Sequence, residues 1–258
     1  MLTFYISPSQ LQVYFLIFLR VSAILFSLPI FSSQNIPIIF KAGLSIAVSI
    51  VLFPVLSLDN SPFLMPAIPF GIGVLGEIVL GIIIGLSVRL LFAGIQLAGQ
   101  FAGFQMGLAI ANVMDPITST QASVIAQFYN LIGMLFFLII NAHHWFLKAL
   151  SESFRLVPPF GFQFTNSLMD QIVKLSGNMF VIAIKVGAPL IAVLLLTSVA
   201  LGLIVRTVPQ MNIFIVAMPL KILIGLMFLA FSLPYMATFF RVIFNGLGND
   251  ILLLLNAV

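Results

Sequence analysis

The sequence VRTVPQMNIFIVAMPLKI, residues 205–222, separates two of the most apolar segments of the chain and decides how they connect. Proline fixes its own backbone angle and donates no amide hydrogen bond, so this stretch favours a turn over a continuous helix. Its two cations would lie at the ends of the flanking apolar segments, where membrane-spanning helices reach the bilayer surface. The polar and proline residues of the stretch are Arg206, Pro209, Gln210, Asn212, Pro219 and Lys221. They predict a connection between two long apolar helices.

The composition of the whole chain identifies the surrounding medium. Of the 258 residues, 62% are hydrophobic and only 6% are charged, which is too little polar surface for a soluble domain. The chain is therefore predicted to be an integral membrane protein. Because about 20 apolar residues cross a bilayer as a helix, this length allows several spans in one all-α membrane domain, residues 1–258.

Six apolar segments follow one another along the chain, and together they predict about six long hydrophobic helices. They are residues 11–31, 38–58, 70–95, 122–147, 176–205 and 214–244. The third segment continues into a glutamine- and glycine-rich stretch that is too polar for a lipid-bathed helix, so we expect protein to shield its far end. Residues 148–174 form the longest water-compatible section. No basic region precedes the first segment, so we expect it to be retained rather than cleaved.

Several functional classes are disfavoured by what the sequence lacks. With no cysteine, the chain has neither disulfides nor thiolate metal ligands. Its net charge of +4 is spread over separated residues, with no run that would follow a nucleic-acid backbone. His143 and His144 are adjacent and would point in different directions on a helix, which favours interfacial packing over metal binding. We therefore predict no enzyme, catalytic residue, cofactor, metal site or nucleic-acid partner.

Gly99, Gly103 and Gly107 recur every four residues in GQFAGFQMG and would form one stripe without side chains on a helix. Such a stripe lets another backbone approach closely. Two alternatives stay open, which are packing within this chain and contact with a partner subunit. Gln96 and Gln100 are also four apart, and each amide needs hydrogen-bond partners from protein or from a water-filled path.

Residues 111–121 break the helical pattern directly after the glycine stripe. Pro116 disfavours helix at Asp115, and the Thr and Ser residues that follow favour local turns. An irregular loop is normally a surface connection, but irregular backbone is also tolerated within a membrane where it lines a cavity. We favour the second interpretation as a hypothesis.

Four ionisable residues, Arg20, Glu77, Arg89 and Lys185, fall within apolar segments, where charge is costly and turns toward partners or water. Glu77 and Arg89 lie about 18 Å apart along a helix, so they do not pair with each other. Each residue is a candidate for an interior site. For Arg20 and Lys185 the simpler expectation is that the side chain reaches out to an interface.

Three pieces of the chain resemble the flagellar member of a family of type III secretion export-gate proteins. They are the stretch 205–222, QMGLAIANVMDP at residues 105–116 and LIINAHHWFLKAL at residues 138–150. Their order and spacing match along most of the chain, and the first is the most specific.

The resemblance implies a non-enzymatic subunit of the flagellar export gate in the bacterial inner membrane, within the flagellar basal body. It implies assembly with FliP-like and FliQ-like membrane subunits, and contact with other export-apparatus proteins and lipid. The complex would be a helical pore for unfolded flagellar proteins. Residues 1–175 would be FliP-like, and residues 176–258 would form a FliQ-like helical hairpin.

The resemblance also implies roles for particular positions. The loop 111–121 would contribute a plug to the closed pore, through Asn112, Val113, Met114, Asp115, Pro116, Ile117 and Thr118. The glycine stripe would be a subunit-packing face. The hairpin turn from Arg206 to Lys221 would lie toward the cytoplasmic entrance.

Two other functions are left open by the residues alone. A small-solute or ion-coupled secondary transporter is suggested by charged residues within apolar segments and by proline-broken helices. A homologous subunit of a virulence type III secretion system is the nearest alternative to a flagellar one.

Overall fold

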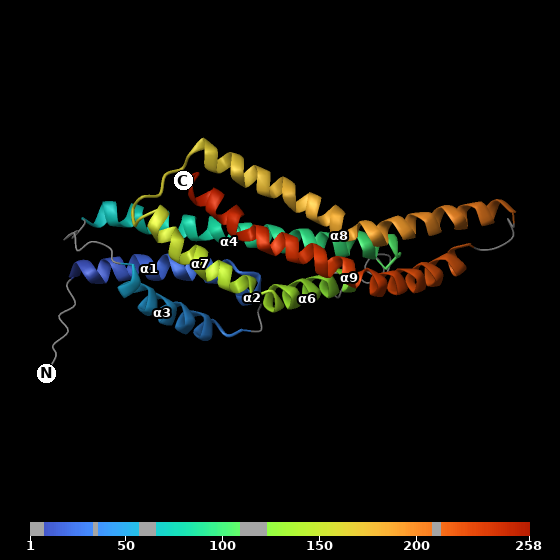
Figure 1. Ribbon diagram of the computed structural model, residues 1–258, viewed down its shortest axis with the longest axis horizontal. Helices are drawn as coiled ribbons and strands as arrows, with labels where there is room; N and C mark the ends of the chain where they lie inside the picture. The colour runs from blue at the N-terminus through green and yellow to red at the C-terminus, as the bar shows by residue number, and fades with distance from the viewer. Residues whose placement is uncertain (1–7, 33–35, 57–65, 109–122, 208–212) are drawn as a thin grey trace. The chain divides into compact units, whose positions relative to one another are not determined.

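The computed structural model describes residues 8–32, 36–56, 66–108, 123–207 and 213–258, and these residues form helices and no strand (Figure 1). The all-α prediction is confirmed. The helices are α1 (Pro8–Ser27), α2 (Pro29–Ser32), α3 (Ile38–Val55), α4 (Ala67–Gln105), α6 (Val124–Ile139), α7 (Ala142–Leu156), α8 (Asn166–Thr207) and α9 (Ile213–Leu255).

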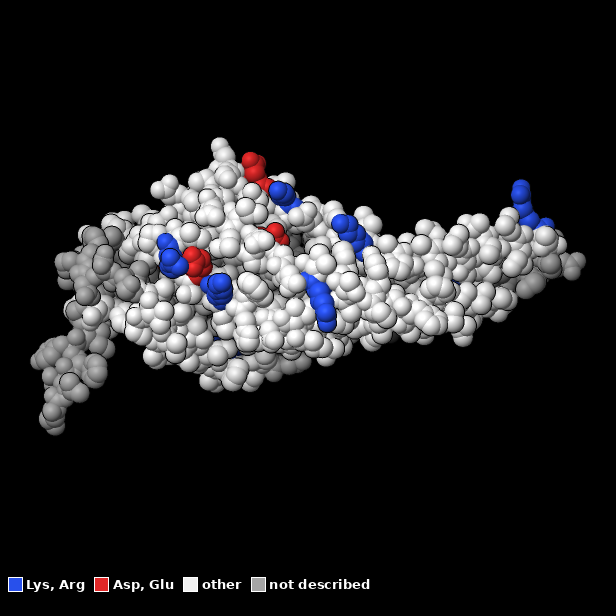
Figure 2. Space-filling model, viewed as in Figure 1, with Lys and Arg blue, Asp and Glu red and all other residues white. Residues whose placement is uncertain are grey.

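The helices match the requirements of a membrane protein. Among the described residues, five are long and apolar enough to cross a bilayer, and the number rises to six if the broken pair α6 and α7 counts as one span. This agrees with the predicted six apolar segments. Charged side chains are few and scattered among uncharged ones on the face shown in Figure 2.

Several helices extend beyond the predicted segments, and α4 and α8 show it most clearly. Helix α4 is continuous for 39 residues, through the glutamine- and glycine-rich stretch. Its far end is shielded as expected, because Ala98, Ala102 and Met106 have no exposed surface. Helix α8 begins at Asn166, so part of the section expected to be water-compatible is helical.

The chain divides into two compact units. Unit 1 contains Met1–Leu90, Asn141–Leu175 and Gly246–Val258, and unit 2 contains Leu91–Ile140 and Ser176–Asn245. Helices α4, α8 and α9 contribute residues to both units. The functional division into residues 1–175 and 176–258 stays a prediction.

Unit 1 is built on parallel packing of α1 against α4. A Cβ atom added at Gly81 would lie 2.6 Å from the Cβ of Ala23, and one added at Gly85 would lie 2.0 Å from the Cβ of Ser27. The missing side chains therefore allow the two backbones to approach closely, as in membrane helix pairs. A small buried cluster also joins α4, α8 and the end of α9, through Ile83, Leu168, Leu254 and Ala257.

Helix α3 packs on α1 with its polar residues inward. Ser45 and Ser49 are fully buried and donate their hydroxyl hydrogens to carbonyls one turn earlier, at 2.9 and 2.7 Å. Ile50 and Val51 are mostly exposed. Small residues inside and large apolar residues outside are the arrangement of a helix surrounded by an apolar medium.

Unit 2 has an aromatic core that joins α4, α6 and α9. The ring of Phe137 lies 5.7 Å from that of Phe92 and 5.3 Å from that of Phe244, in edge-to-face geometry. Such pairs add about 0.5–1.5 kcal/mol each to the burial of their area.

Candidate functional site

The glycine stripe on α4 packs against α6 of the same chain. A Cβ atom at Gly99 would lie 2.6 Å from the Cα of Ala126 and 2.9 Å from the carbonyl oxygen of Ile125. A Cβ atom at Gly103 would lie 2.3 Å from the hydroxyl oxygen of Ser123. Packing within the chain, one of the two alternatives, is therefore present at these glycines. A role in contact with a partner subunit stays a prediction.

Gly107 ends α4 rather than continuing the stripe. Its φ is +83°, a left-handed conformation that side chains disfavour. Its amide donates to the Phe104 carbonyl at 3.0 Å, and the Leu108 amide donates to the Gly103 carbonyl at 3.1 Å. These two bonds form the Schellman motif, which satisfies the last carbonyls of a helix.

The far half of α4 is enclosed by helices of unit 2. A Cβ atom at Gly94 would lie 2.7 Å from the Met179 carbonyl oxygen of α8, and one at Gly225 of α9 would lie 2.7 Å from Cε of Met106. Gln96 and Gln100 are half-buried in this surrounding. The sequence alone did not identify Met106 as a packing residue, because Gly225, which it contacts, lies more than a hundred residues away.

The predicted plug residues lie outside the described residues. These are Asn112, Val113, Met114, Asp115, Pro116, Ile117 and Thr118, within the gap 109–122. The structure does place both ends of that segment. The described chain stops just after the Gly107 cap of α4 and resumes at Ser123, next to Gly103. Both ends therefore belong to the same part of unit 2.

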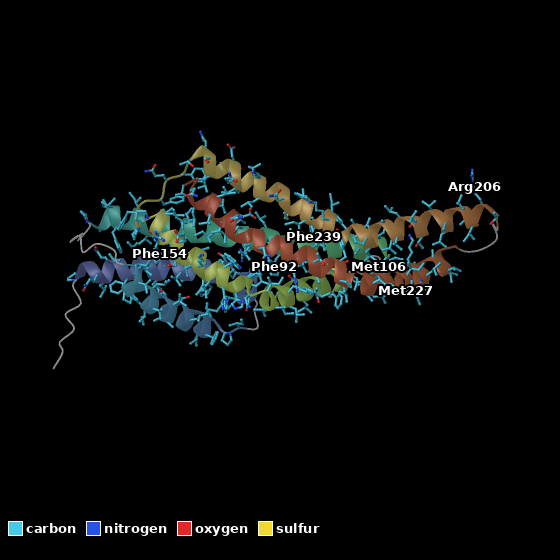
Figure 3. All side chains as sticks on the ribbon, viewed as in Figure 1. Phe92, Met106, Phe154, Arg206, Met227 and Phe239 are labelled. Atoms are coloured by element: carbon cyan, nitrogen blue, oxygen red, sulfur yellow. The ribbon has the colours of Figure 1, made fainter. Side chains whose placement is uncertain are left out.

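The predicted hairpin turn is shorter than the stretch 205–222. Arg206 lies in the last turn of α8, with its side chain exposed and directed away from the ribbon (Figure 3). Pro219 and Lys221 lie inside α9, which begins at Ile213. Pro209, Gln210 and Asn212 lie outside the described residues. The connection between the helices is therefore confined to residues 208–212.

Arg20 does not reach out to an interface, and that expectation was wrong. It is fully buried in unit 1 and pairs with Glu77, which is 2% exposed. Arg20 donates to both Glu77 oxygens, through Nε to Oε2 and through Nη2 to Oε1 at 2.9 Å. Its Nη1 donates to the carbonyls of Ser153 and Val157, both at 2.9 Å.

This network joins α1, α4 and the C-terminal end of α7. The guanidinium carbon of Arg20 also lies 4.2 Å from the centre of the Phe154 ring, within cation–π range. A cation at the end of α7 is favourable, because the last carbonyls of a helix carry partial negative charge. The group is a structural connection between these three helices.

Arg89 and Lys185 are both exposed, and neither makes a salt bridge with any residue that the structure describes. The backbone carbonyl of Lys185 accepts a hydrogen bond from the Tyr235 hydroxyl at 3.4 Å, which links α8 to α9. These two cations are therefore directed away from the interior of the chain.

The described part of the chain holds no group of three or more His, Asp or Glu residues placed to bind a metal ion. The rings of His143 and His144 lie 4.3 Å apart at the start of α7.

Comparison with known proteins gives a consistent result. Residues 11–247 match the sequence model of the family described as bacterial export proteins, family 1. The flagellar biosynthetic protein FliR of Bacillus subtilis (strain 168) is 34% identical over 238 residues, which cover 90% of each chain. FliR of Escherichia coli (strain K12) is 30% identical over 242 residues, covering 93% of this chain and 92% of its own. FliR of Aquifex aeolicus (strain VF5) is 32% identical over 219 residues, covering 84% and 83%.

Proposed function

This chain belongs to the bacterial export proteins, family 1, and from that premise we propose that it is a non-enzymatic subunit of a flagellar type III export gate. The match from residue 11 to residue 247 carries the proposal, because it covers most of every long helix of the fold. The flagellar names of the relatives favour a flagellar over a virulence secretion system.

The chain acts together with other membrane subunits. FliP-like and FliQ-like chains join it in a helical pore in the bacterial inner membrane, at the flagellar basal body. Unfolded flagellar proteins pass through this pore, and lipid surrounds the assembly. Residues 1–175 take the FliP-like position and residues 176–258 the FliQ-like one. The exposed apolar surface of α8 and α9 supports this assembly, since only 17% of the most apolar part of each is buried.

Two connections have functional positions in this proposal. The loop 111–121 forms part of the plug of the closed pore, which fits its attachment at the cap of α4. The turn between α8 and α9 lies toward the cytoplasmic entrance, with Arg206 and Lys221 near it.

Copurification tests the proposal. The full chain, carrying an affinity tag, is expressed with FliP-like and FliQ-like chains from the same bacterium and purified in mild detergent. We expect one stable complex that contains all three chains. Recovery of this chain alone, with the other two expressed and soluble in the same detergent, would contradict the proposal. Solute uptake by vesicles that contain only this chain would instead favour a secondary transporter.

A further inference from the structure

After its first five residues, the N-terminal half of α4 has a single exposed strip. From residue 72 to residue 88 its exposed residues are Ile72, Leu75, Val79 and Ile82, which are exposed by 67%, 64%, 38% and 50%. Ile68 lies on the same strip, one turn earlier, and is 79% exposed. We call residues 68, 72, 75, 79 and 82 the α4 seam. All of them belong to unit 1.

The spacing of the seam is that of a helix that packs along another helix. Its steps of four, three, four and three residues are the alternating steps of a heptad pattern, in which apolar side chains meet a second helix at a small left-handed crossing angle. Helix α3 differs from this part of α4, because it exposes the neighbours Ile38 and Ile39 and the neighbours Ile50 and Val51, whereas α4 exposes no two neighbours between residues 73 and 88.

The seam also contains a hollow. A cavity of about 500 Å³ opens beside Ile72, Leu75 and Val79, and its opposite wall is formed by Phe160 and Phe162 from the connection between α7 and α8. Its other lining residues are Pro69, Gly73, Gly76 and Glu77. This volume holds a large side chain of a partner helix, which enters between the seam residues as a knob enters a hole.

The wall of the cavity is held in an unusual backbone conformation. Phe160 has a φ of +68°, which is unfavourable for a bulky residue. Its ring lies against α4 where Gly73 lacks a side chain, since a Cβ atom there would be 2.1 Å from the ring. Strain of this kind persists only where the surroundings enforce it, and it occurs often at binding sites.

A cation ends the seam. Arg89 follows Ile82 by seven residues and therefore lies on the same strip of α4. It is exposed and makes no ion pair within the described chain. A charge on an apolar helix is costly in lipid and is stabilised by an opposite charge on a neighbouring helix. Arg89 thus favours a protein neighbour with an acidic side chain over an acyl chain.

We propose that the α4 seam binds one apolar helix of another membrane subunit, with a large side chain in the cavity and an acidic side chain at Arg89. This inference rests on the proposed function, because it names the face of this chain that a gate subunit would contact. The partner helix packs in the left-handed geometry of a coiled coil.

Site-directed crosslinking in the complete complex tests the seam. The chain has no native cysteine, so each variant carries one unique thiol. The variants Ile68→Cys, Ile72→Cys, Leu75→Cys, Val79→Cys and Ile82→Cys are labelled with a photoactivatable maleimide and irradiated, and the products are mapped by mass spectrometry. Ile46→Cys and Ile50→Cys on α3 are matched controls, since both are exposed and apolar.

We expect all seam variants to crosslink to one membrane subunit, at positions three or four residues apart on one of its helices, and the α3 controls not to reach that helix. The proposed binding at the α4 seam would be overturned by crosslinks to lipid alone, to a second copy of this chain, or to several subunits without a common helix. If the complex is intact without seam products, the seam is wrong and the proposed function stands. If no complex forms at all, both fail.

The charge at Arg89 gives a second measurement. Arg89→Glu should lower the amount of copurified partner by roughly ten-fold, while Arg89→Lys should keep it within about two-fold, since only the first reverses the charge. Leu75→Ala should lower it by a similar roughly ten-fold factor, through lost packing beside the cavity. If Arg89→Glu and Arg89→Lys copurify equal amounts of the partner subunit, the partner has no acidic side chain at Arg89.

Discussion

Arg20 shows how one residue combines a costly position with a stabilising geometry. Removing two charges from water costs several kcal/mol per ion, and a buried pair is stable only when all its donors are satisfied. Each guanidinium nitrogen of Arg20 donates at least one hydrogen bond, to Glu77 on one side or to the end carbonyls of α7 on the other. Its value is that it fixes α1, α4 and α7 in one arrangement.

Replacing Arg20 by an apolar residue should be strongly destabilising. Arg20→Met leaves Glu77 charged and buried, and we expect a loss of about 3–5 kcal/mol in the free energy of unfolding. The double variant Arg20→Met with Glu77→Leu should recover only part of this, because the Val157 carbonyl loses its Arg20 donor, whereas the Ser153 carbonyl keeps the Val157 amide. Thermal unfolding of the purified protein in detergent measures both. A double variant as stable as the parent would show that the Val157 carbonyl does not depend on Arg20.

Gly99 and Gly43 form a matched pair of helix glycines. Gly99→Ala would place a methyl group against the backbone of α6, which has little freedom to move, so we expect a loss of about 1–3 kcal/mol. Gly43→Ala on α3 meets nothing within 4 Å and should raise stability by about 0.5–1 kcal/mol through helix propensity. Unfolding temperatures measured in the same detergent compare the two. Equal shifts would contradict close packing at Gly99.

At the scale of the element, the start of α8 is tied to the end of α9. The Thr165 hydroxyl oxygen accepts a hydrogen bond from the Leu168 amide at 3.1 Å, which is the side-chain cap of a helix N-terminus. The same hydroxyl donates to the carbonyl of Ala257. The Thr165 side chain thus caps the start of α8 and is also hydrogen-bonded to the residues that follow α9.

Thr165→Val tests the two hydrogen bonds of the hydroxyl separately from the packing of the side chain. Valine keeps the shape of threonine but loses both hydrogen bonds, so we expect a loss of about 1–2 kcal/mol. Thr165→Ser retains the hydroxyl and is the control, with a change of less than about half that amount. Protease digestion of the native protein near residue 258 reports on the released end. Equal digestion of the two variants would argue against the tether.

At the scale of the whole molecule, sequence and structure agree on the number of long helices and differ on what joins them. Runs of about 20 apolar residues are a local signal, so the spans were predictable. The partner of Arg20 is 57 residues away in sequence, and no local pattern identifies it. The glycine spacing predicted close packing at Gly99 and Gly103, but the same spacing concealed the cap at Gly107, since a left-handed residue is defined by backbone angles.

The proposed plug leads to a prediction for the assembled pore. Deleting residues 112–120 should raise the leak of ions through the membrane, because the segment would no longer close the channel. Membrane potential in cells that express the complete complex measures the leak. Complex recovery by copurification is the control for assembly. An unchanged leak with an intact complex would reject the plug assignment.

The division of unit 1 among three stretches of sequence has a consequence for how the protein is made. Met1–Leu90 is synthesised before Gly246–Val258, by roughly 10–30 s at ordinary rates of synthesis. During the first part of that interval Arg20 and Glu77 are present without the α7 carbonyls. Throughout it, Ile83 lacks Leu254 and Ala257. Unit 1 is thus completed only after Gly246–Val258 has been synthesised, which leaves its early helices dependent on insertion machinery or neighbouring subunits for cover.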